Sequence, residues 1–140
     1  MSMDNYYKDS INAPLDENGH HDFEHVEALD IDYFNQQLGD LLSGKQIQSP
    51  IFDFKRGQRS EKTVPMILQS RGIVIIEGIH ALNPIVTKSV NASQKFCIFI
   101  QPLPCINLDD RTRLSTRDYR LIRRIVRDKN TRGCSAERTI

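Results

Sequence analysis

The sequence predicts an α/β fold in which a parallel sheet is flanked by helices, and three observations support this prediction. Residues 73–76 and 96–100 are uninterrupted apolar runs, which are typical of strands buried on both faces. Apolar residues recur at helical spacing from residue 31 to residue 42, and arginines do so from residue 113 to residue 127. Strands that alternate with helices indicate an α/β sheet.

The first forty residues combine a loop with a helix. Residues 4–27 are rich in Asp, Asn, Gly, His and Tyr and show no regular period, so we expect an ordered loop that carries function. The helix that follows can be capped by Asp30 and closed by Gly44. Its apolar side consists of Ile31, Phe34, Leu38, Leu41 and Leu42.

The middle of the chain predicts strands. Residues 47–54 are a short strand candidate, and residues 55–59 form a basic, polar turn. Residues 73–76 and 96–100 predict two central strands, and residues 81–89 between them predict a short helix.

The segment from Arg113 to Asp128 predicts a helix with two different faces. Leucine, isoleucine and valine supply an apolar side, and guanidinium groups form a stripe along another. Guanidinium groups in line repel one another unless an anion lies beside them, so the pattern favours a phosphate-binding helix over a solvated one. The stripe consists of Arg113, Arg117, Arg120, Arg124 and Arg127.

Composition excludes several classes of protein. The chain has 140 residues and a formal net charge of +1, as expected for one ordinary domain. No apolar run approaches the roughly 20 residues of a bilayer helix, and the acidic N-terminal segment does not resemble a signal peptide. The 3 cysteines have no CxxC spacing, which argues against a disulfide framework or a four-ligand zinc site. We therefore expect a cytoplasmic protein without a membrane span.

Charge is distributed unevenly along the chain. Residues 1–40 contain ten acids and one base, whereas residues 111–138 contain ten bases and three acids. A fold that joins the two ends would suit an anion chelated by a metal, with carboxylates on the cation and arginines on phosphate oxygens. Charge alone favours the simpler alternative that both runs are solvated faces.

Glu77 and Asp4 are the acids whose positions most favour a role in binding or catalysis. Glu77 lies where a predicted buried strand ends, which is the place where α/β proteins bind ligands. Gly78, which has no side chain, would let a ligand approach the backbone closely. Glu77 could equally cap a following helix. Asp4 precedes two tyrosines and could accept a proton beside a stacking surface.

Two apparent motifs do not predict the sites that they resemble. Residues 39–45 match the G-x-x-x-x-G-K pattern of a phosphate-binding loop, but Gln46 replaces the required Ser or Thr, and a helix precedes the second glycine. Three histidines at positions 20, 21 and 25 lie near acids in a polar loop, where hydrogen bonding to those acids is commoner than zinc binding.

Six segments together resemble the uridine kinase branch of the phosphoribulokinase and uridine kinase family. They occur in the family's order and cover essentially the whole chain: Ser2–Tyr7, Pro14–Gly19, Asp22–His25, Phe52–Phe54, Ile75–His80 and Arg120–Asp128. The resemblance implies a kinase of P-loop type that uses ATP or GTP with Mg²⁺ to phosphorylate the 5′-hydroxyl of uridine or cytidine.

The resemblance also implies roles for individual residues. Asp4 would accept the hydroxyl proton and help to hold Mg²⁺, and Glu77 would be a second acid beside the metal. Tyr7, Glu24, Phe52 and Phe54 would line the nucleoside pocket, and Arg59 would add a polar contact. Catalytic Arg124 and Arg127, together with Arg120, Arg123 and Arg132, would belong to a lid over the phosphates. These roles fit the needs of phosphoryl transfer.

The chain departs from the family in ways that affect function. The first strand, the P-loop and the C-terminal part are missing, Phe52 stands where a tyrosine is common, and Gly57 stands where a histidine is common. We therefore expect one partial kinase core that is inactive by itself. It would comprise a substrate-binding region at residues 1–60, central strands at 73–100 and an arginine-rich lid at 111–140. The shortened sheet would expose apolar edges and favour a homo-oligomer.

Two alternatives remain open. A kinase of the same family could act on another hydroxyl substrate, such as a sugar phosphate, and thermal-shift screening with pyrimidine nucleosides would separate the two. A non-catalytic module that binds nucleotides or RNA would use the arginine stripe. It is the weaker alternative, because the positive charge is confined to one helix.

Overall fold

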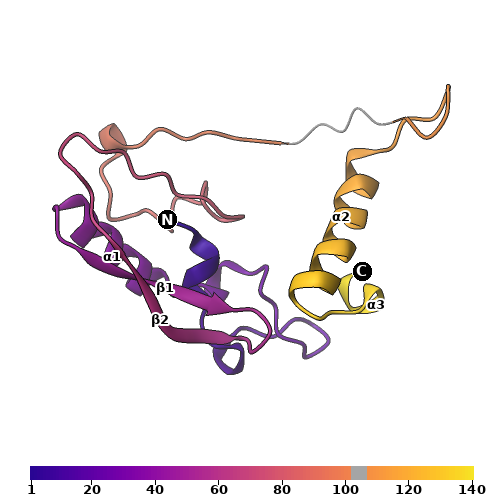
Figure 1. The fold of residues 1–140 in the computed structure, drawn as a ribbon, viewed down its shortest axis with the longest axis horizontal. Helices are drawn as coiled ribbons and strands as arrows, with labels where there is room; N and C mark the ends of the chain where they lie inside the picture. The colour runs from indigo at the N-terminus through magenta and orange to yellow at the C-terminus, as the bar shows by residue number, and fades with distance from the viewer. Residues whose placement is uncertain (102–106) are drawn as a thin grey trace. The chain divides into compact units, whose positions relative to one another are not determined.

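A computed structural model describes residues 1–101 and 107–140 (Figure 1). The chain divides into two compact units, Met1–Ile98 and Phe99–Ile140, and each is described by itself. No helix in the described ranges is long and apolar enough to cross a membrane.

Helix α1, Ile31–Leu42, confirms the first predicted helix. The Asp30 side chain caps it by accepting a hydrogen bond from the backbone N–H of Tyr33 at 3.1 Å. Phe34, Leu38 and Leu41 are buried at helical spacing. The helix closes before Gly44, whose φ of +83° is the left-handed conformation of a helix C-terminus. The glycine-lysine pattern at residues 39–45 therefore belongs to a helix end, as predicted.

Strands β1, Ile47–Asp53, and β2, Gln58–Met66, form an antiparallel hairpin. The β1 strand and the turn after it were predicted, whereas β2 was not. The sequence of β2 gives no strand pattern, because its residues are mostly polar and exposed. The strand is defined by its hydrogen bonds to β1 and not by burial. Phe52 pairs with Arg59 across the hairpin.

The predicted central strands are absent from the described residues, and the two-stranded sheet is antiparallel rather than parallel. Segments 73–76 and 96–100 have no ladder partner there, and Ile73 and Phe96 are 87% and 89% exposed. A β-branched run predicts a strand only when a neighbouring strand completes its hydrogen bonds. Within residues 1–101 and 107–140, parallel pairing occurs at one isolated bridge, between Ser2 and Glu77.

The helix predicted at residues 81–89 is also absent, and the segment forms consecutive turns. Val86 N–H bonds to the Asn83 carbonyl, and Val90 N–H bonds to that of Thr87, so the bonds span three residues rather than four. Pro84 lacks the N–H that a helix would need. The segment is fixed by Asn35 of α1, whose side chain donates to the Val86 carbonyl at 2.9 Å.

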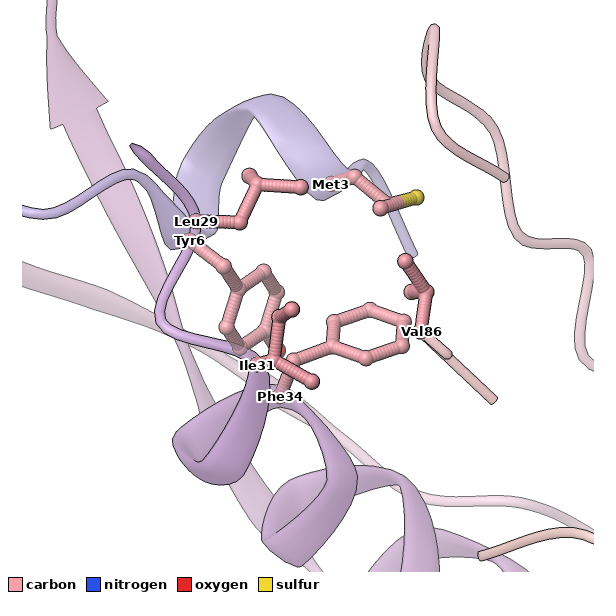
Figure 2. Close-up of a pocket in the computed structure, with 6 residues that line it drawn as sticks. All are labelled: Met3, Tyr6, Leu29, Ile31, Phe34 and Val86. Atoms are coloured by element: carbon pink, nitrogen blue, oxygen red, sulfur yellow. The ribbon is translucent and has the colours of Figure 1, made fainter. Parts of the chain in front are cut away.

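The core of the first unit lies between α1, β1 and the short 3₁₀ helix η1, Met3–Tyr6. Its buried residues are Met3, Tyr6, Tyr7, Ala28, Leu29, Phe34, Leu38, Phe52 and Val86. Figure 2 shows a gap enclosed by six apolar and aromatic side chains, including Met3, Phe34 and Val86. The gap has no room for a water molecule, so it is a packing defect of the core and not a ligand site.

The second unit contains helix α2, Thr116–Thr131, and the short helix α3, Ala136–Thr139. The predicted arginine-rich helix is thereby confirmed, beginning after the Ser115 cap. Its apolar side was expected to pack, but Ile122 and Val126 are more than half exposed.

Candidate active site

The backbone around Asp4 is joined to that of Glu77. Met3 N–H donates to the Glu77 carbonyl at 2.9 Å, and Glu77 N–H donates to the Met1 carbonyl at 3.2 Å. The adjoining Gly78 has a φ of +148°, and a Cβ there would come within 2.8 Å of the Met3 Cβ. This close approach explains why a glycine follows Glu77. The two acids predicted to serve Mg²⁺ thus lie beside the same bridge.

Three aromatic rings lie close together: that of Tyr7, which follows Asp4 by three residues, and those of Phe52 and Phe54. The ring centroid of Tyr7 lies 5.7 Å from that of Phe52 and 6.5 Å from that of Phe54, and the two phenylalanine centroids are 5.1 Å apart. Tyr7 and Phe52 are buried, and Phe54 is partly buried. The three aromatic residues predicted to line a nucleoside pocket are therefore brought together.

Two further residues belong to this arrangement, and the sequence reasoning assigned no role to either. The Phe23 ring packs edge-on against Tyr7 at 5.7 Å. The Asn5 side-chain carbonyl accepts a hydrogen bond from the Phe52 N–H at 3.1 Å and so ties β1 to the segment that carries Asp4. Phe23 could have been found as the aromatic neighbour of Glu24. No local pattern indicated Asn5.

Glu24 lies on an exposed turn next to the aromatic rings. Its backbone N–H donates to the Asp22 carboxylate at 2.8 Å, and the packing of Phe23 on Tyr7 holds the turn beside the cluster. The preceding loop is closed by Asp16, which accepts hydrogen bonds from the backbone N–H groups of Asn18 and His20. The bond from His20, more than any other interaction, lowers the pKa of Asp16.

Arg59 makes internal contacts with the loop beneath the aromatic rings. Its guanidinium donates to the backbone carbonyls of Tyr7 at 3.1 Å and Tyr6 at 3.3 Å, and to the Asp30 carboxylate at 2.9 Å. It also lies 5.0 Å from the centroid of the Tyr33 ring. The side chain is 27% exposed. Arg59 therefore joins β2 to the segment that carries Tyr7.

The predicted lid arginines lie in the second unit. Arg124, Arg127 and Arg132 surround the buried carboxylate of Asp128. Arg123 instead lies over the Tyr119 ring at 5.7 Å, and Arg120 is exposed on α2. Three of the five predicted lid arginines thus share one partner.

Asp4 and Glu77, the two acids predicted to hold Mg²⁺, have side chains of the chemical kind that this ion prefers. Asp4 and Glu77 offer hard carboxylate oxygens, and the described part of the chain has no cluster of three or more metal-binding side chains. Mg²⁺ in phosphotransferases is commonly held by one or two carboxylates, with the remaining ligands being water and phosphate oxygens.

Comparison with known proteins finds relatives of one class, each named a uridine kinase. Over all 140 residues, the chain is 31% identical to a uridine kinase of Bacillus subtilis, covering 58% of its length. It is 32% identical to a uridine kinase of Streptococcus equi subsp. zooepidemicus and 33% identical to one of Streptococcus pyogenes serotype M5, covering 59% of each.

The particular family follows from a match over the whole chain. Residues 1–140 match the Phosphoribulokinase / Uridine kinase family, and the chain belongs to it. This confirms the resemblance inferred from the six segments. The chain spans about three-fifths of the length of these relatives.

Proposed function

We propose that the chain is the nucleoside-binding and lid-bearing part of a kinase that transfers the γ-phosphate of ATP or GTP to the 5′-hydroxyl of uridine or cytidine. The observation that carries this proposal is the cluster of Tyr7, Phe52 and Phe54 rings directly after Asp4. A planar base stacks on such rings, and its ribose would then lie near an acid able to take a proton.

The nucleoside is held by residues of the first unit. The rings of Tyr7, Phe52 and Phe54 contact the base, and the Glu24 carboxylate accepts hydrogen bonds from the ribose hydroxyls. Arg59 contributes mainly by fixing the backbone of Tyr7, to which it donates a hydrogen bond, and secondarily as a polar contact. Positioning of this kind lowers the entropic part of the activation barrier.

Asp4 accepts the proton of the attacking 5′-hydroxyl. The residue is half-buried, and its segment is fixed by the Met3–Glu77 backbone hydrogen bond, so its carboxylate is presented from a rigid element. Mg²⁺, held by Asp4 and Glu77, would neutralise charge on the phosphates. Arg124, Arg127 and Arg132, with Arg120 and Arg123 on the same helix, bind phosphate oxygens of the donor.

We further propose that the 140 residues are inactive by themselves. No phosphate-binding loop of the required strand-loop-helix form occurs among the described residues, and such a loop supplies most of the grip on a triphosphate. Radiolabelled ATP, uridine and Mg²⁺ provide the test: formation of UMP by this chain would contradict the proposal.

Isothermal titration with uridine and cytidine tests the nucleoside pocket. We expect binding by the unaltered chain and a loss of roughly tenfold in affinity for Phe54→Leu, because one stacked ring contributes about 1–3 kcal/mol. Phe96→Leu is the matched control, since that ring is almost fully exposed. Equal affinities in both variants would contradict the assignment. Binding of a sugar phosphate but no nucleoside would favour the other substrate class.

A further inference from the structure

Asp128 is the most enclosed charged side chain among the described residues of α2. Its side chain is 6% exposed, and its carboxylate accepts a hydrogen bond from Arg127 Nε at 2.8 Å. Arg132 Nη1 lies at 3.6 Å and Arg124 Nε at 3.8 Å from the same carboxylate. A carboxylate with three guanidinium neighbours is compensated more than fully, and the cluster keeps an excess of positive charge.

The backbone of Asp128 reinforces this arrangement. Its carbonyl accepts hydrogen bonds from the N–H groups of Arg132 at 3.0 Å and Cys134 at 3.1 Å, which close the C-terminus of α2. Gly133, with a φ of +67°, permits the chain to turn there. One residue therefore fixes both the helix end and the arginine beyond it.

The three arginine side chains are more exposed to solvent than the carboxylate that they contact. The side chains of Arg124, Arg127 and Arg132 are between 29% and 53% exposed, whereas Asp128 lies beneath them. A guanidinium has five N–H donors, so one group can contact a carboxylate and a second anion at the same time. An anion approaching from solvent meets cations that are already held together.

We propose that Asp128 is a positioning residue that holds Arg124, Arg127 and Arg132 as a preformed site for a polyphosphate. This inference rests on the proposed function of the arginines as phosphate ligands. Without the carboxylate the three guanidinium groups repel one another and separate. Asp128 thus contributes to binding an anion although it carries the same sign of charge as the anion.

Because charge repulsion and positioning predict opposite effects of removing Asp128, one binding measurement distinguishes them. Binding of inorganic tripolyphosphate to the complete 140-residue chain is measured by isothermal titration, with helix content checked by circular dichroism. Asp128→Asn and the control Asp118→Asn each remove one negative charge from α2, and Asp118 is an exposed residue of its first turn. Charge alone predicts tighter binding in both. The proposal predicts binding weakened roughly tenfold in Asp128→Asn, about 1.4 kcal/mol, and unchanged or tightened in Asp118→Asn.

A second variant covers the case in which Asp128→Asn loses helix content. Asp128→Glu keeps the charge but moves the carboxylate by one methylene, so weakened binding with helix content retained supports positioning. Unchanged or tighter binding in either Asp128 variant overturns the inference while leaving the arginines as phosphate ligands. A failure of the unaltered chain to bind tripolyphosphate overturns the arginine assignment itself, and this inference with it.

Discussion

At the scale of single residues, Arg59 shows how one side chain supports the candidate site. Replacing it by methionine removes hydrogen bonds to two backbone carbonyls and a carboxylate while keeping much of the apolar stem. We expect Arg59→Met to lower the free energy of unfolding by about 2 kcal/mol and to weaken nucleoside binding. Urea denaturation and isothermal titration measure the two effects.

Arg56→Met provides the control for this prediction. Arg56 is strongly exposed and lies 3.8 Å from Asp53, so its loss should change the free energy of unfolding by less than about 0.5 kcal/mol. If both arginine variants unfold at the same urea concentration, the hydrogen bonds of Arg59 do not stabilise the loop.

Individual residues of the site were predictable to different degrees. Tyr7, Phe52 and Phe54 could be selected because each lies in a short motif, and the structure brings their rings together. The contacts of Arg59 could not be predicted, because its partners lie about 30 to 50 positions away along the chain. The roles of Asp4 and Glu77 in catalysis remain predictions.

At the scale of elements, the β1–β2 turn is fixed against the N-terminal loop at Gly57. Its φ is +66°, and a Cβ there would lie 2.0 Å from Ser10 Oγ, which donates a hydrogen bond to the Gly57 carbonyl. We expect Gly57→Ala to lower the free energy of unfolding by about 2 kcal/mol or more, from left-handed strain and from the clash. Thermal denaturation measures the loss.

Gly44→Ala separates the two causes. Gly44 also has a positive φ, of +83°, but a Cβ added to it would meet nothing within 4 Å, so only the strain of about 1 kcal/mol applies. Equal losses in the two alanine variants would show that the contact with Ser10 is not a constraint. A smaller loss in Gly57→Ala/Ser10→Gly than in Gly57→Ala would identify that contact directly.

Elements with local signals were predicted well. The α1 helix has a cap, a period and a terminal glycine, and it was found from the sequence. The β1 strand was also predicted, as a short strand over residues 47–54, although Gln, Ser and Pro interrupt its apolar residues. The prediction of strands at residues 73–76 and 96–100 was wrong for the described structure. A run of β-branched residues reports only a tendency, and pairing depends on a neighbour that the run itself does not encode.

At the scale of the whole molecule, exposed apolar surface is the main consequence of those unpaired segments. Ile73, Ile75, Phe96 and Ile100 are all more than three-quarters exposed. We expect self-association that increases with protein concentration, because exposed, extended apolar segments tend to pair with other chains. Sedimentation velocity across a concentration series measures it.

Charge substitutions locate the surface responsible. The double variant Ile75→Lys/Phe96→Lys should remain monomeric at concentrations where the unaltered chain associates. Ile11→Lys introduces one lysine at a similarly exposed isoleucine outside the two segments and should leave association unchanged. Association that persists in the double variant would assign it to a different surface.

The hydrogen bond from the Phe52 N–H to the Asn5 side chain has a consequence for selectivity in the proposed kinase. Asn5 follows Asp4 directly, so a base of the wrong shape that shifts Phe52 also displaces the proton acceptor. Poor substrates would then be penalised in turnover as well as in affinity, and discrimination between nucleosides would be greater in kcat/KM than in Kd.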